Sequence, residues 1–136
     1  MRNIKFLDLD KQQKVIKKSL DKRIKNVLKD ARYIMGPEVL ELETRLKDFS
    51  EVEYALTCAN GTDALIIALL ALNIGKGDVV FCPSFTFPAT AEAILITGAE
   101  PLFIDVSKDT FNICPKSIIK KINKKTKAII AVDIFG

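Results

Sequence analysis

The segment Cys58-Ala59-Asn60-Gly61-Thr62-Asp63 contains residue types that could bind a phosphate group where a predicted strand meets a predicted helix. The first N–H groups of a helix have no intrahelical partners and lie at its positive end, so they attract anions. Gly61 would let an anion approach the backbone, and Thr62 would add a hydroxyl donor. Asp63 would offer its N–H while its carboxylate faces away. The same residues could serve equally well as ordinary capping, with Thr62 or Asn60 as the N-cap and no ligand.

Two aromatic residues, Phe85 and Phe87, follow the next predicted strand. At the end of a strand they could stack on a flat ligand. The alternative is that both are core residues beneath a loop, and we favour this for Phe85. Asp105 ends a further predicted strand and could be catalytic, but we favour a turn-forming role, which is common for aspartate.

Several other kinds of site are excluded by what the sequence lacks. It contains neither GxxxxGK[ST] nor GxGxxG, and Gly75-Lys76-Gly77 reads as a turn because it lies between a helix and a strand. The absence of histidine excludes histidine triads, histidine metal ligands and a histidine base from these residues. The three cysteines are not closely spaced, so neither a disulfide framework nor a metal site is expected. We assign no catalytic residue and no metal ligand.

The composition is that of a globular protein: 136 residues, 49% hydrophobic, 28% charged, with a net charge of +4. Lysine and arginine are concentrated in residues 1–32 and 108–136, whereas residues 33–107 are acidic. Basic ends could bind nucleic acid, but we interpret them as solvated helix faces and expect no nucleic-acid partner. No apolar run approaches the roughly 20 residues that cross a bilayer, and the N-terminus is too charged for a secretory signal. We therefore expect a cytoplasmic protein that binds no membrane.

The elements that must position these residues follow from hydrophobic spacing. Two amphipathic helices are predicted, one over residues 10–32 and one beginning at Pro37. Strands and helices then alternate, with strands at 54–58, 78–82, 100–105 and 127–133 and helices at 62–73, 88–97 and 115–123. Such alternation predicts an α/β fold with three layers, α-β-α, and a mostly parallel sheet. We divide the chain into a helical segment, 1–52, and a partial large domain, 53–136.

Two of these elements are apolar enough to predict burial. The helix at 62–73 is apolar nearly all round, and the run 128–132 is typical of a strand that is buried on both faces. The sequence ends directly after this strand, where a functional loop of an open α/β sheet should begin. We therefore expect the front part of a longer protein; the alternative is a small complete four-stranded domain.

A set of short motifs in fixed order resembles a known family. The motifs occupy residues 33–39, 60–65, 75–78, 85–93, 98–101 and 103–106. Together they are similar to the DegT/StrS-type nucleotide-sugar aminotransferases, pyridoxal-phosphate (PLP) enzymes of fold type I. The resemblance runs from about Phe6 to Gly136. Residues 58–63 are most similar to the branch that aminates UDP-2-acetamido-3-oxo-glucuronate for surface polysaccharides.

The resemblance implies roles for particular residues. Gly61 and Thr62, with the amide of Asp63, would hold the phosphate of pyridoxal 5'-phosphate. Phe87 would lie against one face of its ring. Tyr33 matches a position that reaches the nucleotide sugar, and Ala31 stands at a sugar contact where the branch often has glycine.

The resemblance also implies an activity, in which glutamate donates an amino group to a keto nucleotide sugar in a homodimeric enzyme of full length. The lysine of the Schiff base is expected beyond Gly136, because no lysine here stands in the family's Ser-x-x-Pro-x-Lys context. The 136 residues alone are therefore expected to be inactive. Alternatives are a non-catalytic PLP- or phosphate-binding module, a family dehydratase with histidine in place of the lysine, and a small basic module that binds RNA or a partner protein.

Overall fold

The computed structural model describes residues 6–136, which form two compact units that meet between Thr57 and Cys58. Residues 53–57 belong to the first unit, where the backbone N–H of Thr57 donates a hydrogen bond to Glu43. The domain boundary predicted after residue 52 stays a prediction.

The first unit holds two helices, α1 (Leu9–Asp30) and α2 (Pro37–Ser50), which confirms both predicted amphipathic helices. The carboxylate of Asp8 caps α1 by accepting a hydrogen bond from the N–H of Lys11 at 3.1 Å. Pro37 occupies the first turn of α2, where its missing N–H costs nothing. No residue of either helix is fully buried, so their apolar stripes remain exposed within this unit.

The second unit contains a parallel sheet of three strands, β1 (Val79–Pro83), β2 (Glu100–Ile104) and β3 (Thr126–Ile129). The strand order is β2-β1-β3, so β1 is central, and all five of its residues are buried. The crossover through α4 joins the neighbours β1 and β2, whereas the crossover through α5 carries the chain from β2 past β1 to β3 on the other side.

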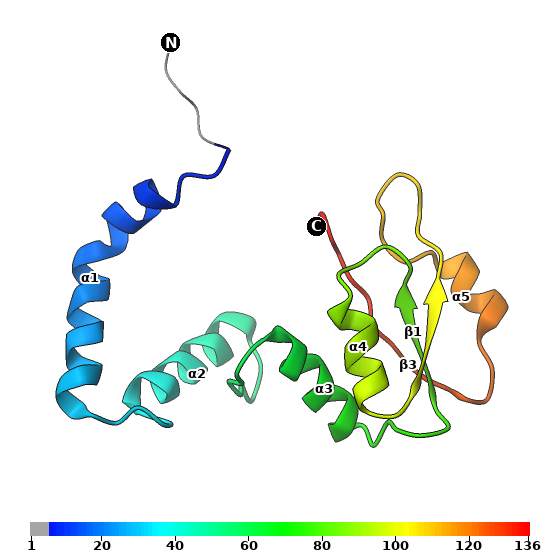
Figure 1. Ribbon diagram of the computed structural model, residues 1–136, viewed down its shortest axis with the longest axis horizontal. Coiled ribbons are helices and arrows are strands. Elements are labelled where there is room, and N and C mark those ends of the chain that lie inside the picture. Colours follow the sequence, from blue (N-terminus) through cyan, green and yellow to red (C-terminus); the bar gives the residue numbers. More distant parts are fainter. Residues whose placement is uncertain (1–5) are drawn as a thin grey trace, which may run out of the picture. The chain divides into compact units, whose positions relative to one another are not determined.

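Three helices cover the sheet: α3 (Gly61–Ala71), α4 (Ala89–Ile96) and α5 (Pro115–Lys121). Alternate residues of β1 define two small cores. On one face Val80 and Cys82 pack with residues from α3 and α4, Leu69 and Ile94 among them. On the other face the partners of β1 come from β2 and from α5. Figure 1 shows α4 and α5 on opposite sides of the strands, which confirms the three-layer arrangement.

The prediction is wrong in details of three elements. Residues 54–58 form no strand, because the N–H of Thr57 pairs with Glu43 instead of a neighbouring strand, so the sheet has three strands and not four. The helix at 62–73 is not buried all round, since Leu69 is the buried residue of α3. The last strand ends at Ile129 and is half-exposed, because within this unit β3 pairs only with β1 and forms an edge.

The helices of residues 6–136 include none with the length and apolar character needed to cross a membrane.

Candidate functional site

The turn that leads into α3 is built by Asn60. Its side-chain oxygen accepts a hydrogen bond from the N–H of Asp63 at 2.9 Å, and its amide nitrogen donates to the Asp63 carboxylate at 3.0 Å. Its backbone carbonyl accepts from the N–H of Ala64 at 3.1 Å. Asn60 is thus the N-cap, which confirms one of the two predicted capping residues. The backbone N–H and the carboxylate of Asp63 are both hydrogen-bonded to its side chain.

The same turn leaves room beside its backbone at Gly61. A Cβ added to Gly61 would meet no atom within 4 Å, and the φ of this residue lies outside the left-handed region. Neither packing nor backbone conformation within the second unit therefore requires a glycine here. A close approach by a ligand to the backbone is a physical reason for one.

The donors at this turn suit a phosphate group. The N–H groups of Gly61 and Thr62 belong to the first turn of α3, so they have no intrahelical acceptor. The half-buried Thr62 adds a hydroxyl beside them. The positive end of the helix favours a negative charge at the same place. The residues present thus fit the phosphate of PLP, although the N–H of Asp63 is already engaged by Asn60.

Phe87 lies in the loop between β1 and α4, directly before the first turn of that helix. Its carbonyl accepts a hydrogen bond from the N–H of Thr90 at 3.1 Å, while its side chain is 74% exposed. The ring is therefore free to contact a flat ligand. Hydroxyls of Thr86 and Thr90, which are 3.0 Å apart, tie the loop to the helix.

Phe85 is not the core residue that we favoured, because its side chain is 45% exposed. Its ring lies 5.3 Å from that of Phe111 and 6.3 Å from that of Phe135, measured between centroids. Phe85 comes from the loop after β1, Phe111 from the segment between β2 and α5, and Phe135 from the segment after β3. The loops place the three rings together at the surface, so they pack on one another and not beneath the sheet.

Asp105 follows β2 and is exposed. Its carboxylate accepts a hydrogen bond from the N–H of Val106 at 2.8 Å, and its carbonyl accepts from the N–H of Cys114 at 2.9 Å. Both hydrogen bonds hold the chain as it leaves the strand, which supports a turn-forming role for Asp105.

Tyr33 and Ala31 lie together in the loop between α1 and α2. Ala31 is the C-cap of α1 with φ 51°, and its N–H donates to the carbonyl of Val27 at 3.0 Å. Gly36 at the other end of the loop is buried, and a Cβ there would lie 2.5 Å from the carbonyl oxygen of Arg32. Between these fixed ends Tyr33 is 66% exposed. The left-handed backbone at residue 31 explains why glycine suits this position.

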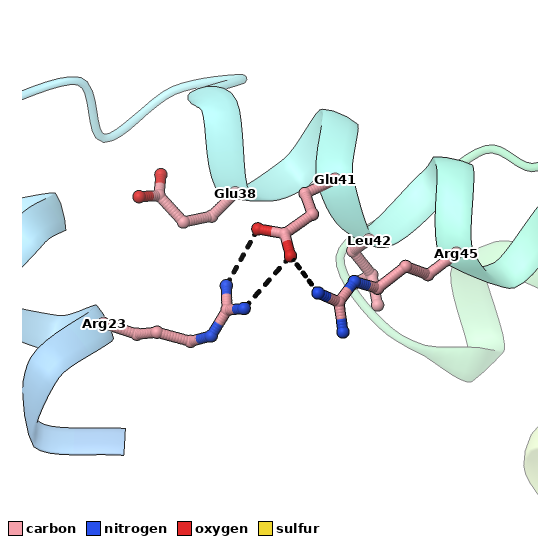
Figure 2. A pocket seen from close by; sticks show the side chains of 5 residues that line it. All are labelled: Arg23, Glu38, Glu41, Leu42 and Arg45. Carbon is pink, nitrogen blue, oxygen red and sulfur yellow. Dashed lines mark hydrogen bonds and ion pairs between the residues drawn. The ribbon is translucent and has the colours of Figure 1, made fainter. Parts of the chain in front are cut away.

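Sequence reasoning missed an ion-pair network that joins α1 to α2. Arg23 donates two hydrogen bonds to the carboxylate of Glu41, at 2.9 and 3.0 Å, and Arg45 pairs with the same carboxylate (Figure 2). The hydrogen bond from Arg23 is the main cause that lowers the pKa of Glu41 to about 2. Only the contact of Arg45 with Glu41 could have been read from the sequence, because these residues are four apart on one helix.

A second carboxylate of α2 fixes the chain just before the turn that leads into α3. Glu43 accepts hydrogen bonds from the backbone N–H and from the hydroxyl of Thr57, both at 2.9 Å. The backbone bond is the largest cause that holds the pKa of Glu43 below its ordinary value. Within residues 6–136 no group of three histidine, cysteine, aspartate or glutamate side chains could hold a metal ion.

Comparison with known proteins identifies the family. The model of the DegT/DnrJ/EryC1/StrS aminotransferase family matches residues 14–136. The chain belongs to this family. It is 47% identical over 133 residues to the UDP-2-acetamido-2-deoxy-3-oxo-D-glucuronate aminotransferase of Pseudomonas aeruginosa, an alignment that covers 98% of this chain and 37% of the relative.

Solved structures of other proteins share the fold. A DegT/DnrJ/EryC1/StrS aminotransferase from Brucella abortus has a TM-score of 0.88 at 44% identity, with 98% of this chain and 38% of that chain covered. NtdA from Bacillus subtilis, solved with bound cofactor PMP, has a TM-score of 0.92 at 31% identity. The match covers 100% of this chain and 32% of NtdA. The expected fold class is thereby confirmed. The chain spans between 32% and 38% of the length of these relatives.

Proposed function

We propose that the protein carrying this chain is a PLP-dependent aminotransferase that moves an amino group from glutamate to a keto nucleotide sugar. Membership of the aminotransferase family and the similarity to an enzyme of a UDP-3-oxo sugar acid support this class of substrate. The observation that carries the proposal is the turn at Gly61, where open space and first-turn donors meet at the positive end of α3. We further propose that the enzyme is a cytoplasmic homodimer.

The residues of the turn would bind the phosphate of PLP. The N–H groups of Gly61 and Thr62 would donate to its oxygens, and the Thr62 hydroxyl would add a third donor. The N–H of Asp63 donates to the side-chain oxygen of Asn60 here. To contribute to the site, it would have to donate to the phosphate instead of Asn60, or to both acceptors at once. The hydrogen bond from Asn60 to the Asp63 carboxylate keeps that negative charge within the cap.

Two further groups would complete this half of the site. The exposed ring of Phe87 would stack on one face of the cofactor ring and limit its rotation. Tyr33 and Ala31 would contact the nucleotide sugar from the loop between α1 and α2. When bound, PLP supplies an electron sink and a carrier for the amino group. We assign proton transfer to none of these residues, because no lysine here stands in the family's Ser-x-x-Pro-x-Lys context.

A transfer experiment tests the proposal. The whole protein, expressed from its complete reading frame, is incubated with PLP, ¹⁵N-glutamate and a UDP-3-keto sugar. We expect mass spectrometry to find ¹⁵N in the nucleotide sugar. A protein that binds PLP but transfers no ¹⁵N would be a binding module, and loss of water from the sugar would indicate a dehydratase. Either result would overturn the proposal.

A further inference from the structure

The loop that carries Ala31 and Tyr33 connects two helices that make little close backbone contact with each other. Neither α1 nor α2 has a fully buried residue, so no apolar core within this unit fixes the angle between them. A short loop between two weakly packed helices takes its position from whatever else joins them. A pair of side-chain hydrogen bonds joins them here, from Arg23 of α1 to Glu41 of α2 (Figure 2).

We propose that Arg23 and Glu41 are positioning residues, which hold α1 against α2 and thereby place Tyr33 for the nucleotide sugar. This inference rests on the proposed function, because it takes Tyr33 as a substrate contact. It adds two residues, 18 positions apart in the sequence, that touch neither cofactor nor substrate in the proposal.

The geometry of the pair suits this role. Both terminal nitrogens of the Arg23 guanidinium donate to the two oxygens of one carboxylate, so the contact fixes an orientation as well as a distance. Arg45 pairs with the same carboxylate from one turn further along α2, which restricts the rotamers available to Glu41. Bidentate pairs and networks of this kind are the exposed ion pairs that contribute measurably.

The loop can transmit the position of the helices to Tyr33 because its ends are fixed. Ala31 closes α1 with a hydrogen bond to Val27, and the carbonyl of Gly36 accepts the first hydrogen bonds of α2. A side chain at residue 36 would collide with the carbonyl of Arg32, so the loop is close-packed on itself. A shift of α1 relative to α2 would therefore move Tyr33 and would not be absorbed by a slack connection.

Steady-state kinetics of the whole protein test the inference, with the Michaelis constants for glutamate and for the UDP-3-keto sugar measured separately. For Arg23→Gln and for Glu41→Gln we expect the KM for the sugar nucleotide to rise roughly tenfold, since misplacement by about 1 Å can cost up to about 100-fold. The value of kcat and the KM for glutamate should stay within about twofold of wild type, because ping-pong kinetics separate the two half-reactions. Arg23→Lys should lie between wild type and Arg23→Gln, since it keeps the charge but loses the two-pronged contact.

Two control variants separate positioning from a general loss of charge. Arg45→Gln removes a cation from the same carboxylate but leaves the contact between the helices intact, and Lys17→Gln breaks an ion pair with Asp21 that lies wholly within α1. Lys17→Gln should leave the KM for the sugar nucleotide unchanged, whereas Arg45→Gln should raise it less than Arg23→Gln does, because it frees the rotamers of Glu41 without breaking the contact with α1. A charge reversal of the pair is avoided, because an arginine at 41 would face Arg45.

The outcomes distinguish this inference from the proposed function. Tyr33→Ala should raise the KM for the sugar nucleotide at least as much as Arg23→Gln does. If Tyr33→Ala raises it and Arg23→Gln does not, the inference is wrong and the proposed substrate contact stands. If Tyr33→Ala has no effect, the inference and the proposed contact of Tyr33 with the sugar nucleotide both fail, and the ¹⁵N-transfer experiment still decides the proposed activity. If Arg23→Gln lowers kcat and raises both Michaelis constants together, the pair is merely structural and the inference is overturned.

Discussion

Replacement of Gly61 by alanine should separate the proposed binding of PLP from stability at the turn that leads into α3. The added methyl group would meet no atom of the protein within 4 Å, and the backbone there is not left-handed. A Gly→Ala change at such a position stabilises a protein by about 0.4–1 kcal/mol, because it lowers the entropy of the unfolded chain. We therefore expect Gly61→Ala to melt at the wild-type temperature or slightly above it in the absence of PLP.

The affinity for PLP should change in the opposite direction. The methyl group would occupy the space through which a phosphate reaches the N–H groups of Gly61 and Thr62. One lost hydrogen bond to a charged group is worth about 1.5–3 kcal/mol, which corresponds to a decrease in affinity of roughly tenfold to 100-fold. A spectrophotometric titration of the whole protein with PLP measures the affinity, and differential scanning fluorimetry without PLP measures the stability.

Gly75→Ala is a matched control for this experiment. Gly75 lies in the turn beyond the opposite end of α3, where its N–H donates to the Asp78 carboxylate at 3.1 Å. An added Cβ there would stand 3.4 Å from the carbonyl oxygen of Thr97, so any cost should fall on stability. The reasoning would be refuted if Gly61→Ala bound PLP as tightly as wild type, or if Gly75→Ala weakened PLP binding equally.

Three further variants test local features of the chain by chemical denaturation. Asn60→Ala should lower the free energy of unfolding by about 1 kcal/mol, because it removes the cap of α3; no change would contradict the capping role. Ala31→Gly should raise the free energy of unfolding by up to about 1 kcal/mol, because alanine is strained at φ 51° and glycine is not. A lower free energy of unfolding would contradict this. The pKa of Glu43 is lowered in the folded chain, so its contribution is present above the ordinary value of 4.5 and is lost as the pH falls through the folded pKa. Glu43→Gln should therefore lose stability at pH 7 but little at pH 3, and equal losses at both would exclude the ionised contact with Thr57.

The sequence was most informative where local pattern decides the structure. The spacing of apolar residues in α1, Pro37 at the start of α2 and the alternation after Gly61 predicted the helices and three of the strands, because periodicity and helix-start signals act over a few residues. Asn60 was recognised as a possible cap for the same reason, since a cap involves neighbours within one turn.

The remaining features depend on contacts between residues far apart in the sequence. Residues 54–58 have strand-like composition but no strand beside them, since Thr57 pairs with Glu43. Phe85 resembles a core residue by type, yet its neighbours Phe111 and Phe135 come from distant loops and pack with it at the surface. Arg23 and Glu41 are 18 positions apart on two different helices, so the spacing of residues along the sequence does not indicate their pairing.

The central claim, that the first turn of α3 holds the phosphate of PLP, is tested most directly by a crystal structure of the whole protein grown with PLP. The account predicts phosphate oxygens within hydrogen-bonding distance of the N–H groups of Gly61 and Thr62 and of the Thr62 hydroxyl, with the cofactor ring against Phe87. A phosphate bound at another place, with the turn at Gly61 open to solvent, would contradict it.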